Sequence, residues 1–249
     1  MTELDALIPT LVSVGLLVVL TVAVLWGFRA QHIGAPALAV LRGGVQLALI
    51  SLILSGVITS PLFVGLALSI MFIVAAVTAT RRLKWSWKNF ALVGISLAAG
   101  IAVTLAIVFG TGAIPFTPRY ALAMGGIIIG NAMTIATLAG RRFTESVIER
   151  WDEVEGWLAL GASPRQSTRD LARGAVYSAL IPSTDQTKTT GLVTLPGAFV
   201  GAIFGGISPL EAGRFQVLVL ASIMAAGSVT AVLIIAILAP VRVRPAPLR

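Results

Sequence analysis

The sequence predicts an all-α polytopic membrane protein with about seven transmembrane helices. Its composition is the first reason, because hydrophobic residues make up 57% of the 249 residues and charged residues only 11%, against about 25% charged residues in a soluble domain. The second reason is that the apolar residues gather in runs of about 20, which is the length of a membrane span. The third is that most of the positive charge falls on one side of the predicted spans.

The predicted spans are separated by short polar loops or by loops rich in glycine and proline. We expect the first span to be retained rather than removed as a signal peptide, because Glu3 and Asp5 precede it where a signal peptide would have basic residues. All spans are assigned to a single transmembrane domain over residues 1–249. They cover residues 7–28, 36–58, 62–79, 90–109, 120–139, 190–207 and 215–239.

The distribution of Lys and Arg predicts the orientation of the spans. If the N-terminus lies outside, 15 of the 18 Lys and Arg residues fall on the inside. Lys188 is one of these 15. The exceptions are Arg119 and Arg214 on the outside and Arg42 within the second span. Cytoplasmic loops are rich in Lys and Arg, so we expect the N-terminus outside and the C-terminus inside. This asymmetry explains the net charge of +8 without a nucleic-acid partner.

Residue types that several kinds of site require are scarce in this sequence. There is no cysteine, which excludes disulfides, thiolate metal sites and cysteine nucleophiles, and there is one histidine, His32. None of the three lysines follows a glycine-rich loop, so the sequence has no P-loop for ATP. We therefore expect no catalytic residues and no cofactor bound by this chain.

Residues 143–182 form the longest polar stretch and are predicted to be a cytoplasmic helical hairpin between the fifth and sixth spans. Ser146 and Glu149 have the spacing of a capping box, which favours a helix start at Ser146. An apolar stripe follows at helical spacing, with acidic residues opposite, which indicates an amphipathic helix rather than a span. The stripe consists of Val147, Trp151, Val154 and Leu158.

A sharp corner of small residues is predicted at residues 160–164. Ser163, Pro164 and Gln166 fit the N-cap, the first position and the third position of a second helix, which we expect to end at Pro182. Such a corner can dock on a cytoplasmic partner, or the hairpin can lie on the membrane surface. The physical pattern by itself leaves both possibilities open.

Residues 155–163 resemble the coupling segment of ABC permeases, in which a Glu precedes a Gly by six residues. More specifically, the chain is similar to the FetB-like family of ABC permeases, which is linked with iron export and includes plant relatives linked with metal tolerance. The similarity lies in residues 41–47, 130–133, 159–163, 191–197 and 209–216. Ala198-Phe199 departs from the family pattern, which often has Met after the glycine of the sixth span.

The resemblance implies the membrane-spanning subunit of an ABC exporter for metal, with iron as the expected cargo. It implies a homodimer of the permease in a bacterial inner membrane, driven by a separate ATPase chain, which would bind the ATP and Mg²⁺. The residues expected to couple to the ATPase are Glu155, Leu158, Ala159, Leu160, Gly161, Ala162, Ser163 and Pro164.

Polar residues inside the predicted spans are candidates for lining a translocation pathway. Arg42 is a charge within the second span, and Gln46 lies one helical turn further along. The alternative for Arg42 is that it snorkels to lipid headgroups. Asn131 and Thr134 share one face of the fifth span, and their alternative is hydrogen bonding between helices.

Glycines four residues apart predict close packing of helices, either within one subunit or between two. They are Gly126 and Gly130 in the fifth span and Gly197, Gly201 and Gly205 in the sixth.

The residues themselves assign no metal site. The predicted span cores contain no Asp or Glu, and the nearest acids are Glu211, near the outer end of the seventh span, and Asp185, near the inner end of the sixth. Arg42 suits an anionic cargo, such as a nucleotide sugar or a lipid, at least as well as a metal. An ion-coupled carrier without an ATPase and a membrane adaptor without transport activity also stay open.

Overall fold

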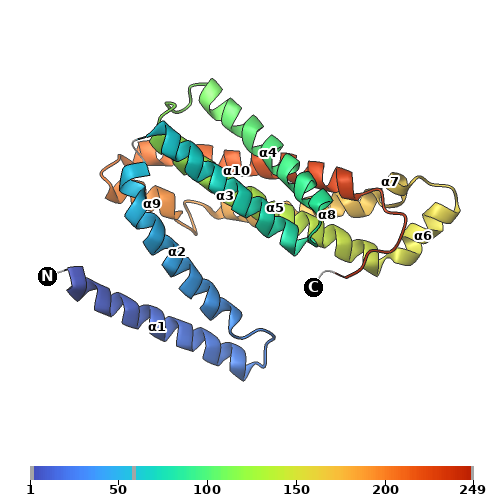
Figure 1. The fold of residues 1–249 in the computed structure, drawn as a ribbon, viewed down its shortest axis with the longest axis horizontal. Helices are drawn as coiled ribbons and strands as arrows, with labels where there is room; N and C mark the ends of the chain where they lie inside the picture. Colours follow the sequence, from blue (N-terminus) through green and yellow to red (C-terminus); the bar gives the residue numbers. More distant parts are fainter. Residues whose placement is uncertain (1–2, 58–59, 248–249) are drawn as a thin grey trace. The chain divides into compact units, whose positions relative to one another are not determined.

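The computed structural model describes residues 3–57 and 60–247, and all ten regular elements in that part of the chain are α-helices (Figure 1). The predicted all-α class is confirmed. The chain divides into two units, residues 1–59 and residues 60–249. The helices are α1 (Glu3–Gly27), α2 (Ala35–Val57), α3 (Pro61–Arg82), α4 (Trp87–Gly110), α5 (Pro118–Glu149), α6 (Trp151–Ala159), α7 (Pro164–Ser167), α8 (Arg169–Thr189), α9 (Gly197–Phe204) and α10 (Pro209–Leu238).

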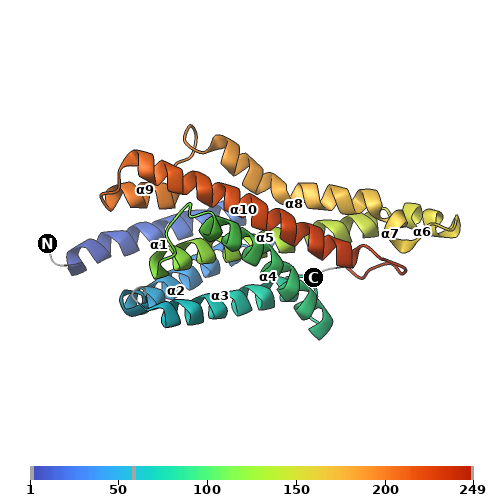
Figure 2. The same cartoon turned by 90° about the horizontal axis from the view of Figure 1, so that it is seen from above.

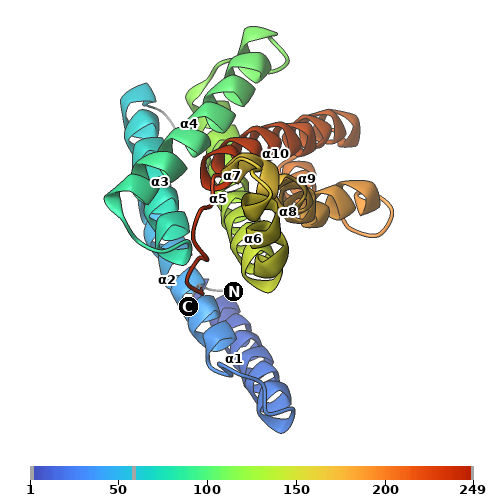
Figure 3. The same ribbon diagram turned by 90° about the vertical axis from the view of Figure 1, so that its right-hand side faces the viewer.

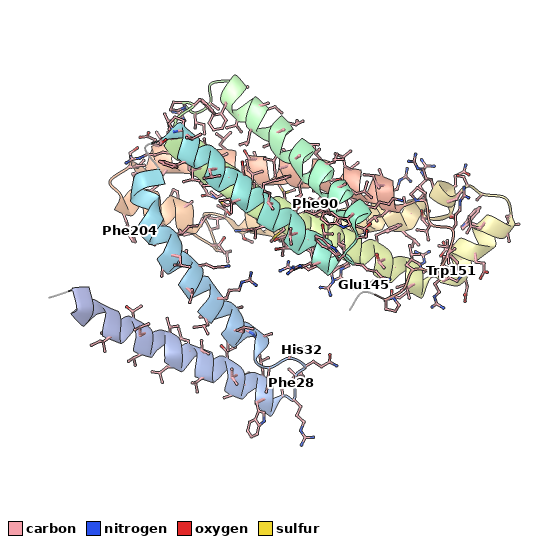
Figure 4. The ribbon with its side chains drawn as sticks, in the orientation of Figure 1. Phe28, His32, Phe90, Glu145, Trp151 and Phe204 are labelled. Carbon is pink, nitrogen blue, oxygen red and sulfur yellow. The ribbon has the colours of Figure 1, made fainter. Side chains whose placement is uncertain are left out.

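The first unit is a pair of long apolar helices, α1 and α2, which match the first two predicted spans closely. Phe28 and His32 lie in the tight turn between them (Figure 4). In this turn Arg29 and His32 have positive φ angles of 55° and 56°, and the backbone N–H of Ala35 donates to the carbonyl of His32 at 2.9 Å. Most of the described side chains of α1 and α2 are exposed, which suits helices surrounded by lipid.

The second unit is a helical bundle centred on α5 and α10 (Figure 3). Both contact α4 and α8, and α3 packs against α4 and α5. A Cβ added to Gly125 would lie 2.7 Å from Cδ2 of Leu68, and one added to Gly140 would lie 2.6 Å from Cδ2 of Leu83. These two contacts show that α3 and α5 run in the same direction.

Helix α4 packs antiparallel to α10 through short side chains. The Thr230 hydroxyl donates to the carbonyl of Ser96 at 3.3 Å. One turn further along α4, a Cβ added to Gly100 would lie 2.6 Å from the carbonyl oxygen of Ala226. Small and hydroxyl-bearing residues of this kind allow membrane helices to approach closely.

Helix α8 also runs antiparallel to α10, along the side of the bundle away from α3 (Figure 2). At one end of the pair, the Thr168 hydroxyl, just before α8, donates to the carbonyl of Ala239 at 2.7 Å. Near the other end, Oγ1 of Thr184 lies 4.0 Å from Sδ of Met224. Helix α8 therefore extends past the middle of α10, and it also contacts α5.

Five helices of the described part are long and apolar enough to cross a membrane, namely α1, α3, α4, α5 and α10. In α2 the apolar stretch found within the described residues, Ala35–Ser51, is shorter. The fold is thus that of a polytopic membrane protein, as the composition predicted.

The sixth span predicted at residues 190–207 is wrong. A turn follows α8, with Gly191 at a φ of 89°, and the next helix, α9, has only 8 residues. Eight residues extend for about 12 Å, which is too short for a hydrocarbon core of about 30 Å. The helix that runs along the bundle here is α8, which was overlooked because it is much less apolar than the other long helices.

Two predicted helix boundaries are also wrong. Ser146 does not start a helix but lies inside α5, which continues to Glu149 because Phe143 and Val147 stay buried on its inner face. Pro182 does not end α8 but lies inside it. Its side chain is exposed, so the ring does not disturb the packed face of α8, on which Ala179 is fully buried.

Candidate functional site

The predicted corner forms between α6 and α7, with its helix start as expected. The Ser163 hydroxyl accepts a hydrogen bond from the N–H of Gln166 at 3.4 Å, and the Gln166 side chain accepts one from the N–H of Ser163 at 2.8 Å. Pro164 takes the first helical position. Gly161 has a φ of 89°, a conformation that favours glycine, and this reverses the chain after α6.

Exposed side chains mark the tip of this corner. Leu160 is 82% exposed, although it is a large apolar residue. Beside it lies an open hollow of about 530 Å³, whose lining includes Trp157, Leu160, Gly161 and Gln166. Glu155 and Ala159 are exposed, whereas Leu158 is partly buried against the core. An exposed apolar tip beside a hollow suits docking of another protein.

The corner is firmly attached to the membrane bundle. The apolar stripe predicted from the sequence faces inward, since Val147 and Val154 are fully buried and Trp151 and Leu158 are partly buried against the core. Figure 4 shows Trp151 at the start of α6, beyond the end of α5. The Arg244 guanidinium also donates to the carbonyl of Ile148 at 3.1 Å, which ties the C-terminal tail to α5.

Thr168 links the corner directly to α10. Its side chain is fully buried between α7 and α8, and its hydroxyl lies 2.7 Å from the carbonyl oxygen of Ala239 and 3.1 Å from that of Pro164. Movement of the corner would therefore reach the end of α10 through this contact. Sequence analysis missed Thr168, because its partner Ala239 is 71 residues away and nothing local indicates the pairing.

Helix α8 has a polar side that no other long helix of the second unit covers. Leu171, Ala175 and Ala179 are buried against the bundle. The opposite side is exposed, and it carries the Asp185–Lys188 ion pair, in which Nζ and Oδ1 are 3.6 Å apart. This pair lies close to the middle of the bundle, since the neighbouring Thr184 contacts Met224, near the midpoint of the 30-residue α10.

Asn131 and Thr134, the two candidate pathway residues of α5, lie at a depth in the bundle similar to that of the Asp185–Lys188 pair. Asn131 Nδ2 donates to the carbonyl of Ile127 at 2.8 Å, and the Thr134 hydroxyl donates to that of Gly130 at 3.1 Å. Both hydrogen bonds stay within α5. The Thr134 side chain is exposed, and Asn131 is half-buried.

The remaining predicted site residues are spread over both units. Arg42 and Gln46 are exposed on α2 in the first unit. A Cβ on Gly126 would lie 3.1 Å from Cε of Met71 in α3, whereas a Cβ on Gly130, Gly197 or Gly201 would meet nothing within 4 Å. A Cβ on Gly205 would meet only carbonyl oxygens of α9 itself, at 3.3 Å.

The side chains that commonly ligate metals do not gather at one place. Among the described residues there is no group of three or more His, Cys, Asp or Glu that could hold a metal ion. The acids outside the corner region are far apart in the second unit, with Glu211 at the start of α10 and Asp185 within α8.

Comparison with known proteins gives the family. Residues 8–241 match the family described as "Uncharacterised protein family (UPF0014)". The chain belongs to this family. It is 37% identical over 218 residues to the UPF0014 membrane protein STAR2 of Oryza sativa subsp. japonica, which covers 87% of this chain and 76% of STAR2. No solved structure matches the chain.

Two other relatives are named for a role. Protein ALUMINUM SENSITIVE 3 of Arabidopsis thaliana is 33% identical over 221 residues, covering 87% of this chain and 81% of the relative. The probable iron export permease protein FetB of Escherichia coli (strain K12) is 35% identical over 159 residues, covering 64% of this chain and 61% of FetB. The resemblance inferred from the sequence motifs is confirmed, and this chain is a multi-pass membrane protein.

Proposed function

We propose that this UPF0014 protein is the membrane-spanning subunit of an ABC exporter that moves metal ions, with iron as the first candidate, and that a separate chain hydrolyses the ATP. The similarity to FetB, named as a probable iron export permease, supports the cargo. The name of ALUMINUM SENSITIVE 3 supports a metal-related role. The observation that best supports the coupling is the exposed corner at Leu160 and Gly161, joined to α10 through Thr168.

The proposed complex contains two copies of this chain and two ATPase subunits. The corner of each copy docks on an ATPase through the residues from Glu155 to Pro164, and ATP and Mg²⁺ bind to the ATPase. Closing of the ATPase pair would push on the corner. The buried stripe of α6 and the Thr168 contact would transmit that movement to α5, α8 and α10.

The proposed topology has seven crossings, made by α1, α2, α3, α4, α5, α10 and by α8 together with the segment that follows it, with the N-terminus outside. The structure changes the charge assignment in one respect, since Lys188, near the end of α8, lies past the middle of the bundle on the side away from the corner. Two basic residues of the second unit lie at the end away from the corner, Arg119 at the start of α5 and Arg214 near the start of α10. The corner end has many more and is therefore proposed to be cytoplasmic: Arg81, Arg82, Lys84, Lys88, Arg141, Arg142, Arg150, Arg165, Arg169, Arg173, Arg242 and Arg244.

A substitution of Leu160→Asp tests the coupling. Leu160 is exposed, so the change should not affect folding, but it puts a charge into the proposed contact with the ATPase. We expect loss of co-purification with the ATPase encoded by the same organism and a fall of about tenfold or more in the ATP hydrolysis of the reconstituted pair, as for a central interface residue.

The matched control is Val243→Asp, which places the same charge on another exposed apolar residue, in the C-terminal tail beyond the same end of the bundle. It should bind the ATPase as the unmodified chain does. If Leu160→Asp also binds and hydrolyses ATP normally, or if no ATPase associates with the unmodified chain, the proposed coupling is rejected.

A further inference from the structure

One side of α8 combines exposure with charge over most of its length. Arg173, Tyr177, Ile181 and Asp185 follow one another at intervals of four residues, and Lys188 comes three residues later. All five side chains are exposed on the second unit. The spacing places them on one stripe of the helix, opposite the buried Leu171, Ala175 and Ala179.

The depth of Asp185 makes this stripe unsuitable for contact with lipid. A 30-residue helix such as α10 is about 45 Å long, close to the full thickness of a bilayer with its headgroups. Asp185 is next to Thr184, which contacts Met224 near the middle of α10, so either membrane surface is about 20 Å away. The short Asp side chain cannot reach a surface at that distance, as Lys and Arg can from closer positions.

Charged groups inside a membrane are found where they face water or other protein groups. The only ion-pair partner of Asp185 in the described part of the chain is Lys188, on the same helix. Both side chains remain more than half exposed, Lys188 at 70% and Asp185 at 62%. The pair therefore does not shield the carboxylate, and the exposed stripe has to face water or the polar groups of another protein segment.

The second unit offers two other kinds of oxygen atom besides the Asp185 carboxylate. Pro182 has no backbone N–H, so it cannot bond to the carbonyl of Ser178, one turn earlier in α8. The exposed Thr134 hydroxyl of α5 is at a similar depth, because its neighbour Ile135 packs against Gly227, three residues from Met224. Carboxylate, carbonyl and hydroxyl oxygens are the ligands that hard divalent cations prefer.

We infer that the exposed stripe of α8 lines a water-filled translocation pathway and that the Asp185 carboxylate binds a divalent cation passing along it. This inference rests on the proposed transport function and names the residue that contacts the cargo. Without a cation, the Lys188 ammonium neutralises Asp185. A divalent cation displaces the ammonium because it offers the carboxylate a higher charge.

Cysteine labelling tests whether the stripe faces water, and the chain is suited to it because it contains no cysteine. Ile181→Cys places a thiol on the stripe, one turn from Asp185. Val103→Cys is the matched control, because Val103 is exposed on α4 at a similar depth, three residues from Gly100, which packs against Ala226. The reagent is a permanently charged, membrane-impermeant methanethiosulfonate, applied to the permease in membrane vesicles.

We expect the thiol at position 181 to react about tenfold faster or more than the thiol at position 103, because a thiol in lipid stays protonated and inert. Equal rates at the two positions would reject the pathway.

Mn²⁺ then tests the cation site, since it prefers the same oxygen ligands as other hard divalent ions. We expect Mn²⁺ to slow the labelling of Ile181→Cys, and to have no effect on Ile181→Cys combined with Asp185→Asn. Labelling of that double variant without Mn²⁺ shows that its pathway is intact. Equal protection of both variants, or of neither, would reject Asp185 as the ligand.

A second variant, Lys188→Met, keeps the carboxylate and removes its competitor. The Mn²⁺ concentration for half-maximal protection should fall by about twofold or more, the size of effect expected when an exposed ion pair is removed; an unchanged concentration would contradict the displacement. None of these measurements needs an ATPase. Protection by Mn²⁺ together with failure to bind an ATPase would therefore reject the ABC coupling and leave the pathway standing.

Discussion

Single glycines determine how closely the helices of the second unit approach one another. Gly100 is the clearest case, because a Cβ there would overlap the Thr230 hydroxyl and lie 2.6 Å from the backbone oxygen of Ala226. Neither atom belongs to a long flexible side chain, so α4 and α10 would have to separate. The glycines singled out by their spacing differ from this, since a Cβ added to Gly130 or Gly201 would have no neighbour within 4 Å.

The Gly100→Ala substitution should therefore destabilise the protein. Overpacking between two helices costs about 1–3 kcal/mol. The control is Gly94→Ala in the same helix, where a Cβ would meet nothing within 4 Å. That change should leave stability unchanged or raise it by about 0.5–1 kcal/mol. Thermal unfolding in detergent measures both, and equal midpoints for the two variants would contradict the close contact.

At the scale of elements, the short helices α6 and α7 and the start of α8 form one connected structure. The capping box at Ser163 fixes the beginning of α7, and Thr168 joins the start of α8 to the end of α10. The carbonyl of Ala239 accepts a buried hydrogen bond from the Thr168 hydroxyl, so the contact is specific as well as close. The corner is thus attached to the bundle by both apolar packing and a buried hydrogen bond.

Thr168→Val should weaken this attachment, because valine keeps the shape of threonine but removes the hydroxyl, so that the carbonyl of Ala239 keeps only the N–H of Val241 as a donor. Loss of one hydrogen bond costs about 0.5–1.5 kcal/mol. Thr184→Val is the same substitution in α8, where the hydroxyl has only a 4.0 Å contact with the Met224 sulfur, and it should cost less. Thermal unfolding in detergent compares the two variants, and a Thr168→Val protein as stable as the Thr184→Val protein would show that the hydrogen bond contributes little.

At the scale of the whole molecule, the bundle of the second unit has two ends that differ in charge. The corner end collects most of its Lys and Arg residues, while α9 and the loop between α4 and α5 lie at the other end. Helix α8 begins at the corner end and ends past the middle of α10, so the loop that follows it lies in the half of the bundle away from the corner. The proposed orientation follows from this arrangement.

Labelling of single cysteines in intact cells tests this arrangement with an impermeant thiol reagent. Ala113→Cys, before α5, and Leu192→Cys, after α8, should both react from outside, because these exposed residues lie in the half of the bundle away from the corner. Asp152→Cys on α6 should react only after the membrane is disrupted. If Leu192→Cys behaves like Asp152→Cys, α8 does not cross the membrane.

The sequence by itself determined the features that depend on residues close together along the chain. Apolar runs marked α1 to α5 and α10, and Ser163, Pro164 and Gln166 marked the start of α7. These predictions succeeded because hydropathy and helix capping act over a few residues. The start predicted at Ser146 failed, because packing of Val147 carried α5 through the local capping pattern.

Only the tertiary structure decided the position of α8 and what it presents at the middle of the bundle. Local hydropathy favoured residues 190–207 as a span, but α8 packs along α10 through Ala175 and Ala179, and Asp185 moves from a predicted inner end to mid-depth. Thr168 likewise meets Ala239 across 71 residues. Such positions depend on which surfaces of distant segments fit together, and a polar helix is retained in the bundle because its small buried residues allow close packing.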